Sequence, residues 1–163
     1  MKKRVLFVLM NRANYARSRS SIEAVSKHND LELKIIAGSG MLLERFGSAI
    51  KIVREDGYII DEELYMNIEG ENPQTMAQSV GLGLTQLAPA ITRINPDVVV
   101  TIADRYETLA TAIAATYMNK ILVHIQGGEL TGTIDESVRH AITKMAHIHC
   151  ASTEESKNRI ISM

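Results

Sequence analysis

Residues 124–129 read His-Ile-Gln-Gly-Gly-Glu and are the part of the sequence most informative about the fold. It continues the apolar run of residues 121–125, passes through two glycines and leads to Asp135 and Glu136, two adjacent carboxylates at an expected helix start. A buried strand, a glycine loop and a charged helix N-terminus are typical of a pocket floor in an open α/β sheet, where ligands bind beyond the carboxyl ends of the strands. The stretch therefore indicates a ligand site rather than a packing element.

The remaining chain alternates short apolar runs with longer helical patterns, which predicts a parallel sheet with crossover helices. Strands are expected at residues 5–10, 31–37, 58–60, 98–102, 121–125 and 147–151. Helices are expected at residues 18–27, 42–55, 75–94, 108–118, 135–146 and 153–161, and a loop at residues 69–73. We predict a single α/β domain over residues 1–163, with helices flanking the sheet.

Composition limits the class of protein. The 163 residues carry 18 Lys and Arg against 19 Asp and Glu, so a formal net charge of −1 gives no reason to expect nucleic acid or an anionic membrane as a partner. No apolar run reaches the ~20 residues of a membrane span, and the N-terminal run is too short for a signal peptide. The single cysteine, Cys150, excludes a disulfide within the chain, and its apolar-leaning neighbours predict that it packs. These features favour a cytoplasmic protein.

The glycine fingerprint of a dinucleotide site is absent. Residues 11–15, which follow the first strand, contain no glycine that would bring backbone close to a pyrophosphate. Gly38 and Gly40 lack a third glycine, and Gly81 and Gly83 fall inside a helical pattern. A nicotinamide or flavin enzyme is therefore not expected, and we predict that no cofactor is needed.

Charged residues follow two of the expected strands at their carboxyl ends. Arg12 follows the first strand, and Asp104 and Arg105 follow the strand at residues 98–102. A guanidinium at such a place suits a phosphate, because its fork contacts two oxygens at once. Each arginine could equally be a solvated surface side chain, and Asp104 could simply cap the next helix.

Candidates for acid–base chemistry gather beyond the strand at residues 121–125, namely Gln126, Glu129, Asp135 and Glu136. Adjacent carboxylates at a helix N-terminus often only complement the helix dipole. Three carboxylates and a glutamine after one strand are nevertheless a dense cluster. If Asp135 and Glu129 converge, their repulsion would raise the pKa of one carboxyl into the range useful for proton transfer.

Four of the five histidines lie between residues 124 and 149. His140 is expected to support the pocket from the helix that carries Asp135, whereas His124 is expected to be buried structure. His147 and His149 would share one face of a strand, but no third ligand is identifiable nearby, so no metal site is expected.

Four stretches resemble one enzyme family: residues 11–15, 104–107, 124–129 and 132–144. With them, almost the whole chain resembles the N-terminal domain of hydrolysing UDP-N-acetylglucosamine 2-epimerases of the sialic- and legionaminic-acid pathway type. The resemblance implies a Rossmann-like domain, the first of two in a glycosyltransferase-B arrangement, with a UDP-linked sugar bound between them. The second domain would be a missing partner, the chain alone would be inactive, and the family's habit of forming dimers or tetramers implies a homo-oligomer.

The resemblance also implies a reaction and the residues that perform it. A base removes the proton at sugar carbon 2 as UDP leaves, and water then adds to the resulting 2-acetamidoglucal with inversion at carbon 2, releasing N-acetylmannosamine. We predict a catalytic set and a substrate-binding set, which are respectively Asp104, Gln126, Glu129 and Asp135, and Arg12, Arg105, Glu136 and His140.

Two departures from the family pattern leave the substrate open. Gln126 stands where members often carry a catalytic glutamate, and an amide cannot act as a base at neutral pH. Asn14 stands where an acidic residue is common. Close relatives act on nucleotide-linked 2,4-diacetamido-2,4,6-trideoxy sugars, which is the first alternative. The others are a glycosyltransferase half-domain, which would transfer sugar to an acceptor, and a non-catalytic nucleotide-sugar-binding domain.

Overall fold

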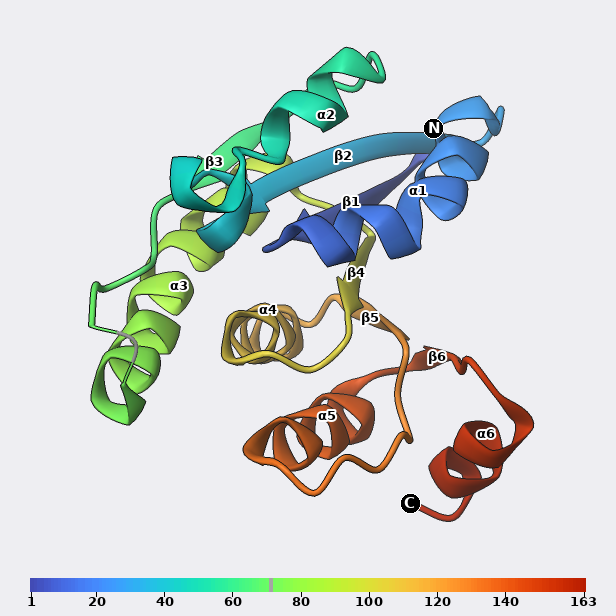
Figure 1. Ribbon diagram of the computed structural model, residues 1–163. Coiled ribbons are helices and arrows are strands. Elements are labelled where there is room, and N and C mark those ends of the chain that lie inside the picture. The colour runs from blue at the N-terminus through green and yellow to red at the C-terminus, as the bar shows by residue number, and fades with distance from the viewer. Residues whose placement is uncertain (71) are drawn as a thin grey trace.

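The computed structural model describes residues 1–70 and 72–163, which build a parallel sheet of six strands in the order β3-β2-β1-β4-β5-β6 (Figure 1). The strands are β1 Lys3–Leu9, β2 Leu31–Gly38, β3 Glu62–Leu64, β4 Val98–Ile102, β5 Ile121–Ile125 and β6 Ile148–Cys150. The order reverses direction between β1 and β4. Such a switch point opens a crevice at the carboxyl ends of these two strands, where ligands bind in sheets of this kind.

Helices cover both faces of the sheet (Figure 1). They are α1 Arg12–Lys27, α2 Ile50–Glu55, α3 Pro73–Ile94, α4 Tyr106–Tyr117, α5 Ile134–Met145 and α6 Glu154–Ile161, with short 3-10 turns at Ser39–Met41 and Glu44–Phe46. Because side chains of a strand alternate between faces, Leu6 and Val8 pack with α3, α4 and α5, whereas Phe7 and Leu9 pack with α1 and α2. The predicted fold class is thereby confirmed.

Most predicted elements are confirmed, and β4 and β5 have the predicted bounds. Helix α1 begins at Arg12, six residues earlier than predicted. The reason is Asn11, whose side chain caps the helix by accepting a hydrogen bond from the backbone amide of Asn14 at 2.9 Å. Arg12 is therefore the first residue of a helix rather than part of a loop.

Three predictions between β2 and α3 fare less well. The helix predicted at residues 42–55 is wrong over its first half, because Gly47 at φ 82° and Ser48 at φ 43° turn the chain before α2. The strand predicted at residues 58–60 is wrong, since β3 pairs with β2 four residues later. Of the loop predicted at residues 69–73, Pro73 already belongs to α3 and residue 71 lies outside the described residues.

Strand β6 forms one edge of the sheet. Its three residues are exposed, so the prediction that Cys150 packs is wrong. The cause is topological: β6 pairs with β5 on one side, and no other described strand lies beyond it.

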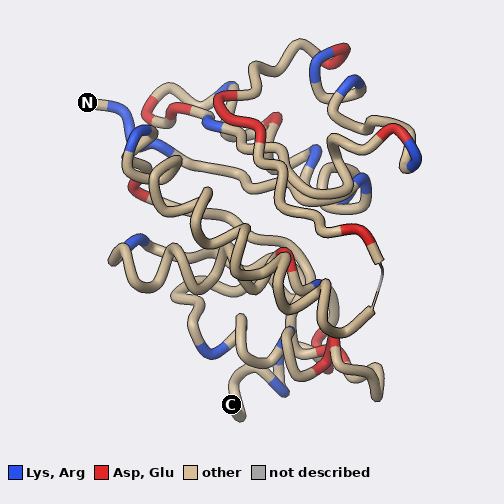
Figure 2. Tube along the Cα trace, turned by 90° about the vertical axis from the view of Figure 1, so that its left-hand side faces the viewer, with Lys and Arg blue, Asp and Glu red and all other residues tan. Residues whose placement is uncertain are grey.

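The surface carries charge of both signs. Segments of Lys and Arg and segments of Asp and Glu are scattered along a mostly neutral chain trace (Figure 2). Within residues 1–70 and 72–163, no helix combines the length and apolar character that a membrane crossing requires.

Candidate active site

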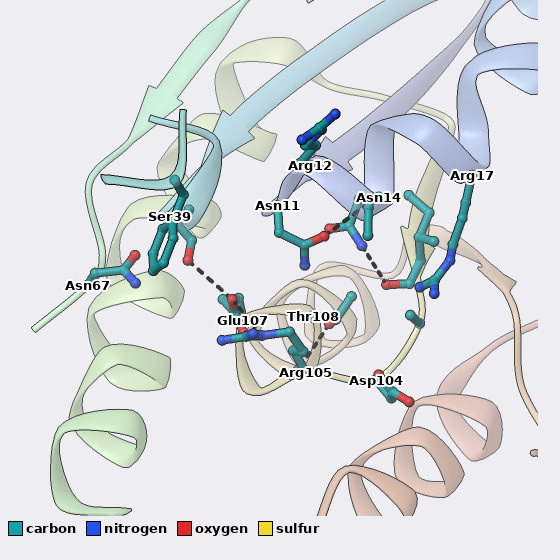
Figure 3. Close-up of a pocket in the computed structure, with 15 residues that line it drawn as sticks. Asn11, Arg12, Asn14, Arg17, Ser39, Asn67, Asp104, Arg105, Glu107 and Thr108 are labelled. Atoms are coloured by element: carbon teal, nitrogen blue, oxygen red, sulfur yellow. Dashed lines mark hydrogen bonds and ion pairs between the residues drawn. The ribbon is translucent and has the colours of Figure 1, made fainter. Parts of the chain in front are cut away.

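A cleft of about 330 Å³ lies at the switch point between β1 and β4 (Figure 3). Asn11 and Arg12 reach it from the start of α1, Ser39 from the turn after β2, and Asp104 and Arg105 from the loop after β4. A second hollow of about 270 Å³ adjoins it and shares Arg17, Ala103 and Asp104 with it. The two form one continuous depression along the carboxyl edge of the sheet.

Arg139 joins the two loops that border this depression. From α5, its Nε donates to Oδ2 of Asp104 at 2.9 Å, and its Nη2 donates to the same oxygen. Its Nη1 donates to the backbone carbonyl of Glu129 in the loop after β5. Only 4% of Arg139 is exposed. Its positive charge therefore faces the protein interior, where it holds Asp104 and Glu129 near each other.

Arg139 was assigned no role from the sequence, although its position carried a signal. Arg139 shares the buried face of α5 with Ile142 and Thr143, three and four residues further on. An arginine within the apolar stripe of a helix is seldom buried without a charged partner. The position thus predicted a buried acidic partner, which the structure identifies as Asp104.

The carboxylate of Glu129 also lies near this guanidinium. Its Oε2 is 3.7 Å from Nε of Arg139, and both carboxylate oxygens are buried without a hydrogen-bond partner among the described residues. Buried carboxylate oxygens normally have such partners. Glu129 therefore keeps its capacity to accept a proton or a hydrogen bond from a ligand.

Gln126 lines the same hollow as Asp104 and Glu129. Its backbone has φ 62°, and its backbone amide donates to the carbonyl of Cys150 at 3.0 Å. The structure thus brings together three of the four predicted catalytic residues. The fourth, Asp135, lies in the first turn of α5 and is not among the residues that line either hollow.

Glu136 and His140, both predicted to bind substrate, also lie outside the two linings. Oε2 of Glu136 accepts hydrogen bonds from the backbone amides of Thr131 and Gly132, at 2.5 and 2.8 Å, and these bonds hold the pKa of Glu136 below its usual range. Glu136 thus fixes the loop before α5. Nε2 of His140 is buried and has no partner in the described part of the chain.

Three arginines are among the residues that line the cleft, namely Arg12, Arg17 and Arg105 (Figure 3). Arg12 and Arg17 are exposed, and no hydrogen bond or ion pair with another described residue engages either of them. Nε of Arg105 donates to Glu107 at 3.2 Å, while 55% of the Arg105 side chain stays exposed. Cations gathered at one crevice favour an anionic ligand.

Glu107 is a further residue of the cleft that sequence analysis left without a role. It is 2% exposed, and it accepts a hydrogen bond from Oγ of Ser39 at 3.3 Å. Burial raises the pKa of its carboxyl above the usual value, against the opposing effect of Arg105. The sequence did contain an indication of this role, because Glu107 is an acidic residue at the start of the alanine-rich helix α4 and lies on its buried face.

Asn14 has a structural reason to be an amide. Its Oδ1 accepts from the backbone amide of Met10 at 3.0 Å, and its Nδ2 donates to the carbonyl of Ile102 at 3.2 Å. It therefore ties the end of β1 to the end of β4 at the switch point. An ionised aspartate could accept the first bond but could not donate the second.

Comparison with known proteins identifies the family. The family model described as UDP-N-acetylglucosamine 2-epimerase matches residues 23–163. A UDP-N,N'-diacetylbacillosamine 2-epimerase (hydrolyzing) of Legionella pneumophila is 36% identical over 100% of this chain and 43% of its own length. A UDP-N-acetylglucosamine 2-epimerase of Neisseria meningitidis is 32% identical over 99% of this chain and 42% of its own length.

Solved structures agree in fold. The crystal structure of the Neisseria meningitidis UDP-GlcNAc 2-epimerase bound to UDP-GlcNAc matches with a TM-score of 0.83 at 23% identity, over 98% of this chain and 42% of that one. The UDP-N-acetylglucosamine 2-epimerase structure from Listeria monocytogenes, titled as putative, matches with a TM-score of 0.85 at 20% identity, over 99% of this chain and 42% of that one. This chain spans less than half the length of these relatives. Since the family model covers most of its residues, the chain belongs to the UDP-N-acetylglucosamine 2-epimerase family.

Proposed function

We propose that the chain is the N-terminal half of a hydrolysing sugar-nucleotide 2-epimerase, which converts UDP-N-acetylglucosamine and water to N-acetylmannosamine and UDP. One observation carries the proposal: Asp104 and Glu129 meet at the buried guanidinium of Arg139, beside a cleft bordered by Arg12 and Arg105. Proton transfer at carbon and departure of a diphosphate need this combination of carboxylates and cations.

In the first step the bond from carbon 2 to hydrogen breaks and its electrons form the carbon 1–carbon 2 double bond. The bond from carbon 1 to the UDP oxygen breaks, and UDP leaves with that electron pair. Glu129 suits the role of base because its carboxylate oxygens have no hydrogen-bond partner among the described residues. Arg12 and Arg105 would neutralise charge on the departing diphosphate.

Asp104 has a different part in this scheme. Arg139 fixes its carboxylate, so Asp104 supplies a stationary negative charge where positive charge develops at carbon 1 as UDP departs. In the second step an acidic group delivers a proton to carbon 2 from the opposite face, water adds its hydroxyl to carbon 1, and the remaining proton of that water restores the acidic group. The proton that Glu129 took up in the first step passes to solvent. Asp135 would serve this hydration, and the amide of Gln126 would bind the sugar without exchanging a proton with it.

The proposal includes the rest of the protein and its setting. Curated relatives are more than twice as long as this chain, so we assign the remaining nucleotide contacts to a second domain and expect the 163 residues alone to be inactive. No redox cofactor takes part in either step. We place the enzyme in the cytoplasm, where it would supply amino sugars for nonulosonic acid synthesis.

Proton NMR of the full-length protein in deuterated water tests the reaction. With UDP-N-acetylglucosamine we expect free UDP and N-acetylmannosamine that carries deuterium at carbon 2. Free sugar that keeps its original proton at carbon 2 would contradict the elimination step. Sugar appearing only on an added acceptor would point to a glycosyltransferase, and UDP binding without turnover would point to a non-catalytic domain.

A second substrate has a specific observation in its favour. The Legionella relative, at 36% identity, is named for a diacetylated bacillosamine nucleotide, which fits the 2,4-diacetamido-2,4,6-trideoxy alternative. Gln126 in place of a glutamate fits an altered substrate as well. The same NMR assay with both nucleotides decides: the true substrate is the one with the higher kcat/KM.

A further inference from the structure

We infer that His124 is a positioning residue, whose buried ring holds the backbone at Ala103 and thereby fixes Asp104 in the active site. The inference rests on the proposed function, because it takes Asp104 to be catalytic. His124 lies on β5 and Asp104 follows β4, so the ring acts across two neighbouring strands. Three features of the structure support this role: a costly backbone turn, a ring with a fixed proton, and a loop shaped to that ring.

The backbone turn lies immediately before Asp104. Ala103 has φ 66°, a conformation that a residue with a Cβ adopts only at a cost. Two contacts to β5 hold it there. The amide of Ala103 donates to the carbonyl of Ile125 at 2.9 Å, and its carbonyl lies 2.8 Å from Nε2 of His124. Without the second contact, the peptide between Ala103 and Asp104 would lose its only described hydrogen-bond partner.

The chemistry of the ring fixes which nitrogen carries the proton. His124 is 1% exposed, and burial lowers its pKa to about 4, so the ring is neutral near pH 7. A carbonyl can only accept, so Nε2 must carry the proton that bonds Ala103. Nδ1 is then an acceptor, and the hydroxyl of Thr143 on α5 lies 3.3 Å from it. The Ala103 carbonyl therefore selects the tautomer, and the Thr143 hydroxyl can donate to the Nδ1 that this tautomer leaves as an acceptor.

The loop after β5 is shaped around the same ring. A Cβ at Gly127 would lie 2.9 Å from Oγ1 of Thr143, so that one of the two would have to shift, and 3.1 Å from Nδ1 of His124, which is a tight contact. Gly127 thus lets the loop that carries Gln126 and Glu129 pass directly over the imidazole. One ring consequently sets the relative position of the two loops that line the active site.

A matched pair of variants tests this in the full-length protein. The amide nitrogen of glutamine can occupy the place of Nε2, whereas that of asparagine reaches only the place of Nδ1. His124→Gln should keep kcat within a few-fold of the unmodified protein. His124→Asn should lower kcat on the order of 100-fold, because a small displacement of Asp104 misaligns the reacting groups, while KM changes little.

A second variant asks whether the turn is what His124 holds. Glycine adopts positive φ without the cost that alanine bears, so Ala103→Gly combined with His124→Asn should recover part of the lost kcat. Leu122→Ala is the control for general damage, since Leu122 is buried on the same strand but lies in the core under α5. It should lower the unfolding temperature and leave kcat unchanged at assay temperature.

Nitrogen-15 NMR of labelled histidines gives a readout independent of turnover. The neutral Nε2–H tautomer of His124 is expected in the unmodified protein, and Thr143→Val should keep it, because the Ala103 carbonyl still accepts from Nε2. A proton found on Nδ1 in the unmodified protein would overturn the inference, as would equal kcat values for folded His124→Gln and His124→Asn. If no substrate turns over, the proposed function fails, and the tautomer alone then decides the tether between His124 and Ala103.

Discussion

The guanidinium of Arg139 on α5 donates from Nε to Oδ2 of Asp104, in the loop after β4, across 2.9 Å. The Arg139 side chain is 5% exposed and that of Asp104 is 21% exposed, so water screens this ion pair only weakly. The pair connects elements 35 residues apart in the sequence. The pair therefore links distant parts of the fold, and it also lies in the candidate active site.

Replacement of Arg139 should destabilise the chain. Arg139→Ala leaves Asp104 largely buried without its cation, which typically costs about 3 kcal/mol or more of unfolding free energy. Arg139→Lys should have a free energy of unfolding between those of the unmodified protein and Arg139→Ala, because an ammonium keeps the charge but cannot form the two-pronged contact of a guanidinium. Urea denaturation measures both. Arg93→Ala, which breaks an exposed pair with Glu62, is the control and should hardly move the midpoint; an equal effect would refute the role of the buried pair.

Loss of a predicted catalytic charge should abolish most turnover. Asp104→Asn and Asp135→Asn keep the shape of the side chain but remove its charge and basicity, so kcat of the full-length protein should fall by about 100-fold or more. Asp97→Asn is the matched control. Asp97 pairs with Lys3 just before β4, at the opposite end of that strand from Asp104. Near-normal rates for Asp135→Asn would remove that residue from the catalytic set.

Removal of a cleft cation should weaken nucleotide binding. Arg12→Ala should raise the Kd of UDP for the full-length protein by about tenfold, the value of one charge-assisted hydrogen bond. Added salt should narrow the difference, because it screens the lost attraction. Calorimetric titration gives both results. Arg19→Ala, on the same helix but paired with Asp56, should leave the Kd unchanged, and equal losses would place the diphosphate elsewhere.

Two glycines near the loop after β5 should differ in their tolerance of alanine. A Cβ at Gly128 would lie 2.4 Å from the carbonyl oxygen of Ser156, whereas one at Gly132 would meet nothing within 4 Å. Both have positive φ, 80° and 69°. Gly132→Ala should therefore cost only about 1 kcal/mol of backbone strain, and Gly128→Ala should cost clearly more and displace α6. Urea denaturation decides, and equal stabilities would contradict the close packing of α6.

Acid should destabilise the chain through His124. Its pKa is about 4 in the folded state against 6.5 for an unperturbed histidine, so between these values only the unfolded chain takes up the proton. The contribution of the neutral His124 to the free energy of unfolding is complete above pH 6.5. It is lost as the pH falls toward 4, and the loss is up to about 3 kcal/mol. Because glutamine does not titrate, His124→Gln should lose less stability than the unmodified chain between pH 7 and pH 4.5. Parallel losses in urea denaturation would show that His124 is not the group responsible.

The buried strands were predictable because their signal is local. Residues 98–102 and 121–125 are continuous apolar runs, which suit a parallel strand covered on both faces, and both bounds are confirmed. The segment from residue 42 to residue 49 was not predictable in the same way. Its helix-like composition yields to the positive φ of Gly47 and Ser48, which depends on packing against the rest of the domain.

The site was predictable in its place and only partly in its contacts. The strand ends located Asp104, Arg105, Gln126 and Glu129 at one edge of the sheet, as the structure has them. The contact between Arg139 and Asp104 depends on how α5 packs against α4 and β5, beside the loop after β4, which no local pattern contains. The same holds for the ring of His124 under Ala103, since the strand run alone predicts only that the histidine is buried.

Three corners of the active-site rim follow one rule. Ser39 after β2, Ala103 after β4 and Gln126 after β5 each turn the chain through positive φ, at 50°, 66° and 62°. Each corner takes part in a main-chain hydrogen bond: the amides of Ala103 and Gln126 donate to the neighbouring strand, and the carbonyl of Ser39 accepts from Leu42. The backbone thus sets the shape of the rim, and the side chains project from it. A change between glutamine and glutamate at position 126 would then alter the chemistry of the rim and leave its backbone in place. A family with this backbone could therefore acquire new substrates through single side-chain substitutions.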